Sequence, residues 1–341
     1  MPLEKRLIRP RSFTQLIFRS AVRILVTAAV AVAVLGGVAA GLLTQPIFGS
    51  VPYQGVLRAD PGRLRRHVEF LTREALPRDS DHPASLDRAA VYIRHELERS
   101  GLRVEEQVWQ VRGVSYRNVV ASLGPVEGRR LIVGAHYDAF GVFGANPGAD
   151  DNASGTAGLL ELARLLAARP PARRVDLVAY ANEEPPYFAS PWMGSAVHAR
   201  SLAGKDVQGM ICLEMIGYFT AEQPWPSAVL RLLYPGRGDF AAVVGRWPDR
   251  GLTRAVKRAM RGAGPLPVYS FTGPRDAGID ASDQRCYWEV GLPAVMVTDT
   301  SFLRNPGYHI PQDTAATLDY ERMSGVVDGV CNAVLALSSG T

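Results

Sequence analysis

The stretch Arg130-Leu-Ile-Val-Gly-Ala-His-Tyr-Asp138 decides the fold, because it is a short apolar run that ends in polar side chains. Such a run is typical of a strand that is buried on both faces of a parallel sheet. Three more apolar runs follow at Val175–Tyr180, Gly209–Leu213 and Pro293–Thr298, and a helical pattern covers Ser154–Ala168. We therefore predict an α/β fold: a three-layer sandwich with a mostly parallel central sheet and helices on both faces.

Two helices and two strands are predicted ahead of this stretch. Apolar residues recur at helical spacing in Pro61–Leu71 and in Leu86–Ser100. Arg103–Val111 and Arg117–Ser122 alternate apolar and polar residues, which indicates strands. We expect one domain over residues 57–341.

Side chains that can bind metals gather at the ends of the predicted strands and in the loops after them. They are His136, Asp138, Asp150, Asp151, Glu183, Glu184, Glu214 and, in a late loop, His309. In open α/β sheets, ligands bind beyond the carboxyl ends of the strands. Imidazoles and carboxylates without a thiol suit zinc or a similar divalent ion, which would also neutralise so many buried acids.

The adjacent pair Glu183 and Glu184 indicates two distinct tasks at one strand end. One carboxylate can bind a metal while its neighbour accepts a proton from the attacking water and later delivers it to the leaving amine. Two metals a few ångströms apart would share a bridging carboxylate.

In this order and spacing, the motifs resemble those of the M28 zinc metallopeptidases. The resemblance covers nearly the whole predicted domain and implies a zinc-exopeptidase fold without an inserted protease-associated domain. It rests on six segments: Gly134-Ala-His-Tyr-Asp138, Gly148-Ala-Asp-Asp-Asn-Ala-Ser-Gly155, Asn182-Glu-Glu184, Leu213-Glu-Met-Ile-Gly217, Ser282-Asp283, and Tyr308-His309 with Asp313-Thr314.

The resemblance implies a role for each ligand-type side chain. His136, Asp151 and Glu214 would hold one zinc ion. Asp151, Glu184 and His309 would hold the other, so that Asp151 bridges the two ions.

Three further residues receive roles from the same resemblance. Glu183 would be the general base, and Asp138 would orient His136. Tyr308 would donate its hydroxyl to the oxyanion of the tetrahedral intermediate.

Asp151 is preferred to Asp150 as the bridging acid, because that acid precedes a short segment ending in Ser-Gly in the family, here Asn152–Gly155. The chain departs from the family at two positions. Glu214 stands where many relatives carry Asp, and Gln284 follows Ser282-Asp283 where many carry His. The first departure bears on metal spacing and affinity, and the second on a contact near the substrate.

The N-terminal segment predicts a membrane anchor. Residues 1–23 are basic, residues 24–43 form an uncharged stretch that is long enough to cross a bilayer, and residues 44–56 form a linker rich in Pro and Gly. Because the cations precede the span, we expect a cytoplasmic N-terminus and a catalytic domain in the periplasm or outside the cell. The alternative is a signal peptide, cleaved after Ala40, which releases a secreted domain.

The net charge of +5 does not indicate a nucleic-acid partner. Residues 1–23 carry all of it, so the remaining residues sum to zero and create no overall field that would steer DNA or RNA. The expected partners are a peptide substrate and, through the N-terminal helix, a membrane. The oligomeric state and the substrate preference stay open.

We therefore expect a two-zinc exopeptidase, an aminopeptidase with Glu183 as general base. One alternative is a glutaminyl cyclase with a single zinc. Another is a carboxypeptidase, for which Arg275, Arg285 and Arg304 are candidates to bind the substrate carboxylate. A non-enzymatic alternative is a membrane receptor or scaffold on a peptidase fold, which the complete set of ligand-type residues disfavours.

Overall fold

The chain folds into two compact units, residues 1–43 and 44–341. The computed structural model describes residues 13–141 and 146–339, so the first half of the predicted basic segment lies outside the described residues. We describe each unit by itself.

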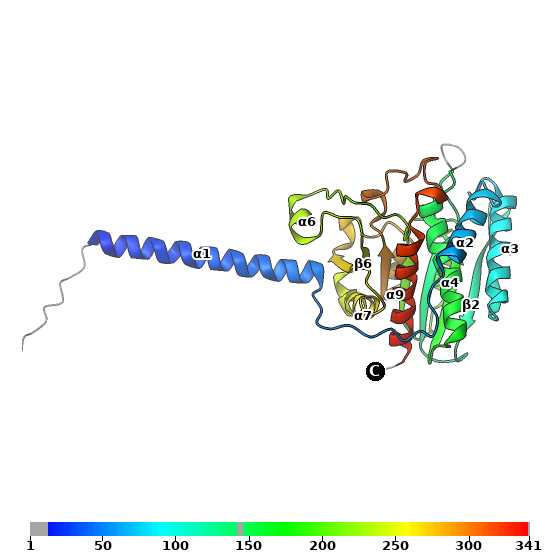
Figure 1. Cartoon of the computed structure of the whole chain (residues 1–341), viewed down its shortest axis with the longest axis horizontal. Coiled ribbons are helices and arrows are strands. Elements are labelled where there is room, and N and C mark those ends of the chain that lie inside the picture. Colours follow the sequence, from blue (N-terminus) through cyan, green and yellow to red (C-terminus); the bar gives the residue numbers. More distant parts are fainter. Residues whose placement is uncertain (1–12, 142–145, 340–341) are drawn as a thin grey trace, which may run out of the picture. The chain divides into compact units, whose positions relative to one another are not determined.

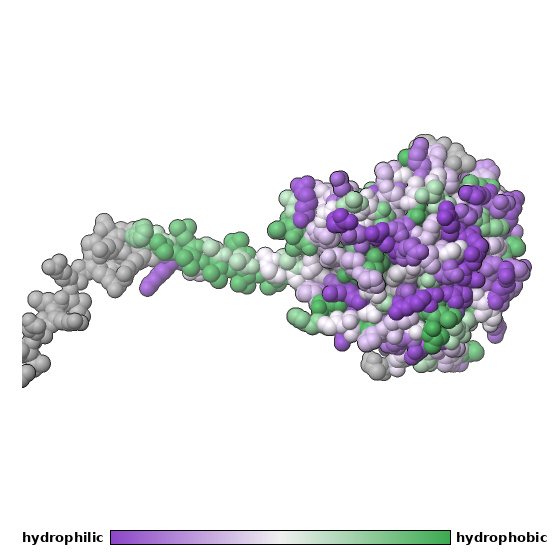
Figure 2. Space-filling model, viewed as in Figure 1, coloured by the Kyte–Doolittle hydropathy of each residue, from purple (hydrophilic) through white to green (hydrophobic). Residues whose placement is uncertain are grey.

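The first unit contains the long helix α1 (Phe13–Thr44). Its stretch Ser20–Thr44 is long and apolar enough to cross a membrane, although a signal sequence passes the same test. In Figure 2 the coloured part of this helix has a mainly hydrophobic surface, whereas the face of the second unit that is visible there is mainly hydrophilic.

The second unit is built on one sheet of eight strands (Figure 1). In space the strands follow the order β1-β2-β4-β3-β5-β8-β6-β7. In sequence they are β1 (Arg103–Val111), β2 (Val114–Leu123), β3 (Arg130–His136), β4 (Arg174–Tyr180), β5 (Val207–Leu213), β6 (Ala241–Arg246), β7 (Val268–Gly273) and β8 (Ala294–Thr298).

The four central strands β4, β3, β5 and β8 run parallel to one another. Antiparallel pairs join β2 to β4 on one side and β6 to β8 on the other. In this register His136 lies opposite Tyr180 on β4, and Gly134 lies opposite Cys212 on β5. The carboxyl ends of the central strands therefore meet at one edge of the sheet, where the predicted ligands stand.

Helices cover both faces of this sheet. One face packs against α2 (Pro61–Arg73), α3 (Pro83–Arg99), α4 (Gly155–Ala168), α7 (Arg250–Met260) and α9 (Tyr320–Ser338), several of which are labelled in Figure 1. The other face packs against α5 (Gly194–Ser201) and α8 (Gln284–Glu289), while the short α6 (Ala228–Leu233) belongs to the loop between β5 and β6. The alternation of strand residues divides the hydrophobic core accordingly: Val133 faces the first layer, and Ile132 faces the second.

This architecture confirms the predicted three-layer α/β sandwich with one apolar helix ahead of it. The predicted strands over residues 103–111, 130–138 and 209–213 correspond to β1, β3 and β5, with shifts of a few residues at their ends. Strands β6 and β7 and helices α7 and α9 had not been assigned from the sequence.

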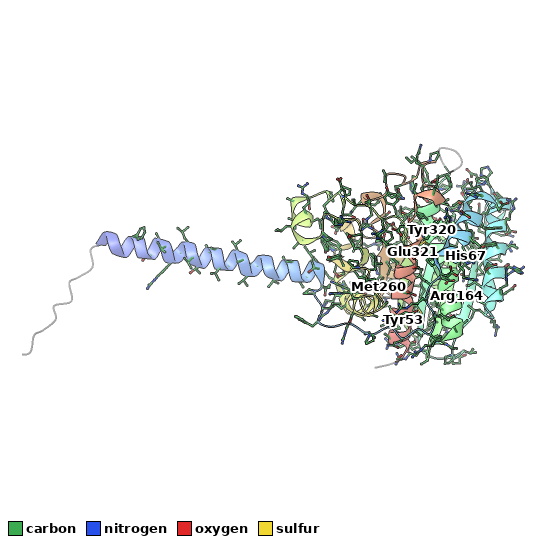
Figure 3. The ribbon with its side chains drawn as sticks, viewed as in Figure 1. Tyr53, His67, Arg164, Met260, Tyr320 and Glu321 are labelled. Atoms are coloured by element: carbon green, nitrogen blue, oxygen red, sulfur yellow. The ribbon has the colours of Figure 1, made fainter. Side chains whose placement is uncertain are left out.

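The segment expected to be a linker is held against the second unit. Asn332 accepts the N–H of Gln54 and donates to the carbonyl of Val51, and Asp328 accepts the N–H of Ala59. Tyr53, labelled in Figure 3, donates its hydroxyl to the carbonyl of Leu57. Residues 44–59, which we call the strap, thus bond to α9 through three backbone groups, although their Pro and Gly content indicates a linker.

The close contact between Gly134 and Tyr180 generates a stability prediction. A Cβ at Gly134 would lie 2.2 Å from a carbon of the Tyr180 ring, which is fully buried and bonded through its hydroxyl to Tyr287. We expect Gly134→Ala to lower the free energy of unfolding by about 1–3 kcal/mol, as overpacked cores do. Urea denaturation measures this change.

Gly251→Ala is the matched control, because a Cβ at this exposed position of α7 meets no atom within 4 Å. It should leave the stability unchanged or raise it slightly, since alanine favours helices. Equal stability of Gly134→Ala and the wild type would show that Tyr180 does not restrict this position.

Candidate metal centre

The loops after the central strands turn sharply at the carboxyl edge of the sheet. His136 is the last residue of β3, Glu183 and Glu184 follow β4, and Glu214 follows β5 directly. The neighbouring residues Asn182 and Met215 adopt positive φ angles of 62° and 47°. Left-handed backbone at non-glycine positions is uncommon and is found where surrounding structure fixes a site. All four ligand-type side chains are buried.

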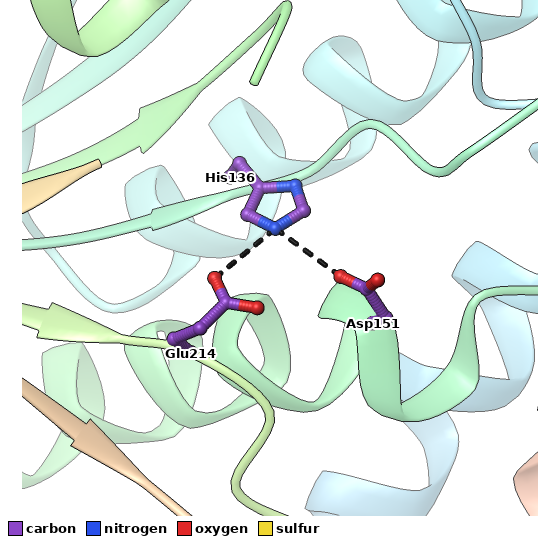
Figure 4. A group of neighbouring side chains, drawn as sticks. All are labelled: His136, Asp151 and Glu214. Atoms are coloured by element: carbon purple, nitrogen blue, oxygen red, sulfur yellow. Dashed lines mark ion pairs between the residues drawn. The ribbon is translucent and has the colours of Figure 1, made fainter. Parts of the chain in front are cut away.

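One group of side chains converges on His136 (Figure 4). The His136 Nε2 atom lies 3.4 Å from Asp151 Oδ1 and 3.2 Å from Glu214 Oε2. Asp151 belongs to the helical turn η1 (Ala149–Ser154), which opens helix α4. Three elements therefore contribute one ligand atom each to a single point.

A second group shares Asp151 with the first. His309 Nε2 lies 3.1 Å from Asp151 Oδ2 and 3.4 Å from Glu184 Oε2. The imidazole of His309 is stacked between the rings of Phe140 and Tyr308, at centroid distances of 4.1 Å and 3.7 Å. The structure thus brings together all five residues that the sequence nominated as ligands, with one Asp151 oxygen directed to each histidine.

The donor atoms fit a cation. His136 Nε2 and Glu184 Oε1 are buried and have no hydrogen-bond partner. Within each group the ligand atoms lie within 4.8 Å of one another, and imidazole nitrogens with carboxylate oxygens suit a divalent metal. Buried polar groups without partners are costly, so a bound ion accounts for their arrangement.

The acids and imidazoles of the cluster shift one another's pKa values. Burial and the Asp151 carboxylate raise the pKa of Glu184 to about 8. Burial lowers the pKa of His309, but contacts with Asp151 and Glu184 outweigh it and raise the value to about 10. Protons therefore balance the buried negative charge in the absence of a cation, and metal binding displaces them.

Glu183 belongs to neither group of ligands, although it stands beside the first. Its Oε2 atom lies 4.0 Å from His136 Nε2. Burial raises the pKa of Glu183 well above its ordinary value, with the carboxylates of Glu184 and Glu214 acting in the same direction and His136 opposing them. A carboxyl group that holds a proton readily and binds no metal can exchange that proton with a substrate or water.

Asp138 connects the end of β3 to the loop after β4. Its carboxylate accepts the N–H groups of Glu183 and Glu184, at 3.2 and 2.9 Å. Asp138 Oδ1 also lies 3.4 Å from His136 Nδ1, and its backbone oxygen lies 3.2 Å from the same nitrogen. Asp138 therefore positions the backbone of Glu183 and Glu184 and also contacts the Nδ1 atom of His136.

Asp313 accepts the backbone N–H of Asp151, the candidate bridging residue, and was not assigned a role from the sequence. Its Oδ2 atom accepts the N–H of Asp151 at 2.9 Å, and its Oδ1 atom accepts that of Asp150. The carboxylate of Asp150 points away, accepting from Gly217 N–H and from Asn305 Nδ2. This geometry favours Asp151 over Asp150 as the ligand.

The buried cation Arg78 bonds to the backbone near the site, and no role was assigned to it from the sequence. It is 1% exposed and donates to the carbonyls of Tyr137 and Gly148, at 2.9 Å each, and to those of Leu71 and Pro147. The two ends of the connection between β3 and η1 are thereby tied to one side chain.

The two departures from the family motifs have structural counterparts. The longer side chain of Glu214 reaches His136 and accepts the hydroxyl of Ser282 at 2.6 Å. Gln284 is completely buried and donates to the carbonyl of Ile279 at 2.9 Å. Gln284 is therefore part of the buried core, where it bonds to the backbone of Ile279.

An apolar cavity of about 370 Å³ opens beside Glu214. Strands β6, β7 and β8 line it with Val244, Phe271 and Met296, and the loop that contains α6 adds Leu230 and Tyr234. Because these residues lie far apart in sequence, no local sequence pattern predicted the cavity.

Fold, site and sequence together define a metal-dependent peptidase. Residues 118–334 match peptidase family M28. The match covers more than half of the chain, so this chain belongs to peptidase family M28. The membership confirms the predicted metallopeptidase and its divalent metal.

Curated relatives come from bacteria and fungi. The uncharacterized protein YfbL of Escherichia coli is 49% identical over 281 residues, which cover 80% of this chain and 87% of that protein. Leucine aminopeptidase 1 of Uncinocarpus reesii is 28% identical over 60% of this chain. The alignment spans only 51% of the fungal protein.

Solved structures share the fold at low identity. The LapA aminopeptidase of Legionella pneumophila superposes with a TM-score of 0.67 at 20% identity, covering 82% of this chain and 72% of that one. A glutaminyl cyclase of Bacteroides thetaiotaomicron gives 0.63 at 18% identity, covering 82% of this chain and 99% of that one. The same sandwich therefore occurs in enzymes with different reactions.

The contacts of Asp138 generate a prediction about metal affinity. Asp138→Ala removes the acceptor of two N–H groups and the neighbour of His136. We expect zinc affinity to fall by about 10–100-fold, because groups that orient ligands have effects of this size. Competition with a chromogenic chelator measures the affinity. Asp328→Ala, which removes a carboxylate in the strap contact instead, should leave it unchanged.

Proposed function

We propose that the protein is a two-zinc aminopeptidase that removes N-terminal residues from peptides. The observation that carries the proposal is the pair of ligand groups that share Asp151, with Glu183 beside them but outside both. His136, Asp151 and Glu214 would hold one ion, and Asp151, Glu184 and His309 the other. Bound zinc supplies Lewis acidity for the scissile carbonyl and lowers the pKa of water.

The residues around the ions divide the remaining work. Glu183 accepts the proton of the attacking water and passes it to the departing nitrogen. Asp138 keeps Glu183 and Glu184 in place through their N–H groups. Tyr308, whose ring is stacked on His309, is proposed to donate its hydroxyl to the oxyanion.

The charged groups near the site bear on whether the enzyme acts at the N-terminus or at the C-terminus of a peptide. A substrate ammonium group meets several carboxylates at the site. A carboxypeptidase would need a free cation, but Arg275 is paired with Asp280 and Glu289 at 3.0 and 2.8 Å. Arg285 lies near the same two acids.

Arg304, the third candidate, is bonded through part of its guanidinium group. It donates to the side chain of Gln223 at 2.7 Å and to the carbonyl of Phe240 at 3.0 Å. Arg275 and Arg285 are thus paired with acids, whereas the Nη2 atom of Arg304 is buried without a hydrogen-bond partner in the described part of the chain. The pairing of two of the three candidate arginines supports aminopeptidase action. The cavity beside Glu214 further favours an apolar N-terminal side chain.

We also propose that residues 24–43 anchor the protein in a membrane, with the peptidase domain of residues 57–341 on the extracytoplasmic side. The support is the apolar stretch Ser20–Thr44 and the basic residues before it. Intact protein in the salt-washed membrane fraction would agree with the anchor, whereas a soluble form beginning near Gly41 would indicate signal-peptide cleavage.

Peptide analysis tests the proposed reaction. The full chain, saturated with zinc, should shorten peptides with an apolar first residue from the N-terminus, and N-acetylation should abolish cleavage while C-terminal amidation does not. Mass spectrometry of the products distinguishes the alternatives. Inhibition by amidation alone would show a carboxypeptidase, and loss of ammonia from N-terminal glutamine without shortening would show a cyclase.

Substitution of Glu183 and of Glu184 tests which of the two is the general base and which is a metal ligand. We expect Glu183→Gln to retain its metals while kcat falls by about 10²–10⁴-fold, because an amide cannot accept the proton. Glu184→Gln should lose metal as well as activity. Paired measurements of zinc content and kcat decide, and loss of zinc from Glu183→Gln alone would reverse the assignment.

Metal analysis tests the shared ligand. The wild type should approach two zinc ions per chain, His309→Ala should retain one, and Asp151→Ala should retain neither, because Asp151 faces both histidines. His95→Ala, which changes an exposed histidine of α3, is the control. A fully active wild type with one ion would contradict the two-metal proposal.

A further inference from the structure

Helix α7 carries a row of four exposed arginines on one side. Residues four, four and three positions apart fall on the same helix face, and each of these arginines is exposed. They are Arg250, Arg254, Arg258 and Arg261, which we call the arginine row. From first to last the row extends about 16 Å along the helix.

The arginine row has no acidic partner among the described residues. Elsewhere on the surface, arginines do pair: on α3, Arg94 lies near Glu98, and Arg99 lies 3.1 Å from Glu96. Because the chain beyond residue 23 sums to zero charge, the row is a local excess of positive charge. Such a row attracts a polyanionic surface.

The same helix holds the end of the apolar stretch. Lys257 is buried and donates to the carbonyls of Thr44 and Gln45, at 2.8 and 3.2 Å. Ser270 on the edge strand β7 also donates to the Thr44 carbonyl, at 2.7 Å. Thr44 is the last residue of the candidate membrane span, so Lys257 of α7 bonds to the residue at which the chain would leave a bilayer.

An exposed aromatic side chain stands next to this point. Phe48 is 92% exposed, and it lies in the strap between Gln45, which contacts Lys257, and Val51, whose N–H donates to the carbonyl of Arg258. An exposed aromatic ring in a segment that contacts a basic helix is a combination that favours the region between lipid headgroups and acyl chains.

We propose that the arginine row and Phe48 dock the peptidase domain onto the headgroups of anionic phospholipids in the membrane that holds the anchor. This inference rests on the proposed anchor of residues 24–43. Docking would fix the orientation of the domain, and the charge attraction acts only within about 10 Å, so a domain that swings freely would not feel it. The ligand chemistry is the phosphate diester of a lipid headgroup, which arginine binds in a bidentate manner.

A fluorescent label next to the row tests the contact in the full chain. Gly251→Cys places a thiol on the exposed side of α7, where a Cβ meets no atom within 4 Å, and the three native cysteines are buried. The protein is reconstituted in nanodiscs of phosphatidylcholine alone or with half phosphatidylglycerol. Acrylamide, a neutral quencher, reports whether the label is covered. Val91→Cys on α3, 43% exposed and packed near the β1–β2 edge of the sheet, is the control label.

We expect the label at position 251 to become less accessible in anionic nanodiscs, while the label at 91 does not change. Each arginine near an anionic leaflet favours the docked state by about fivefold, so Arg254→Gln with Arg258→Gln should weaken docking by about 25-fold and restore quenching. Arg66→Gln with Arg73→Gln removes the same charge from the exposed surface of α2 and should have no effect. Thermal unfolding verifies that each variant is folded.

The possible outcomes distinguish failure of the proposed docking from failure of the proposed membrane anchor. A chain that does not co-elute with nanodiscs would refute the anchor itself. A chain that co-elutes with equal quenching in both lipid mixtures would overturn the proposed docking, whether the label is covered in both or in neither. Protection that survives the Arg254 and Arg258 substitutions would show that Phe48 and other apolar residues act without the row.

Discussion

The carboxylate of Asp151, buried between two imidazoles, is the constraint on which the rest of the site depends. Burial raises the pKa of Asp151, but its contacts with His136 and His309 outweigh burial and hold the value below the ordinary range. Asp151 therefore stays charged in a place where an isolated charge would be expensive. The surrounding structure makes this tolerable: Asp313 accepts the Asp151 N–H, which fixes the backbone, and the central strands deliver the imidazole of His136 and the acid Glu214.

Much of this arrangement follows from local sequence patterns. A buried parallel strand is a continuous apolar run, so the strands that end at His136 and Glu214 are visible in the sequence, and the polar residue after each run marks the catalytic edge. Strands β6 and β7 are short, and their patterns do not separate helix from strand. Their places at the edge of the sheet depend on tertiary packing. Helix α7 does carry a helical pattern, with Val256, Ala259 and Met260 buried and arginines on the opposite side, although it had not been assigned from the sequence.

The supporting residues were harder to predict than the ligands, for a related physical reason. Asp313 meets the N–H of Asp151 across 162 positions of sequence, and Arg78 meets the carbonyl of Gly148 across 70. Backbone groups have no side-chain signature, so the sequence does not reveal which residue bonds to them. Asp313 belongs to one of the six motif segments, yet its contact with Asp151 could not be predicted from that motif. The strap shows the converse: its Pro and Gly content indicates a linker, yet Asn332 and Asp328 of α9 bond to three of its backbone groups.

Glu214 connects the candidate metal centre to the apolar cavity. Its carboxylate faces His136, Ser282 donates to the same oxygen, and its side chain also forms part of the wall of the apolar cavity. Glu214 has one methylene more than the aspartate of many relatives, and its carboxylate reaches the ligand group while the residue also lines the cavity. A substrate side chain in that cavity would therefore press on a residue that is proposed to hold a metal, so selection of the N-terminal residue and activation of its carbonyl would depend on one side chain.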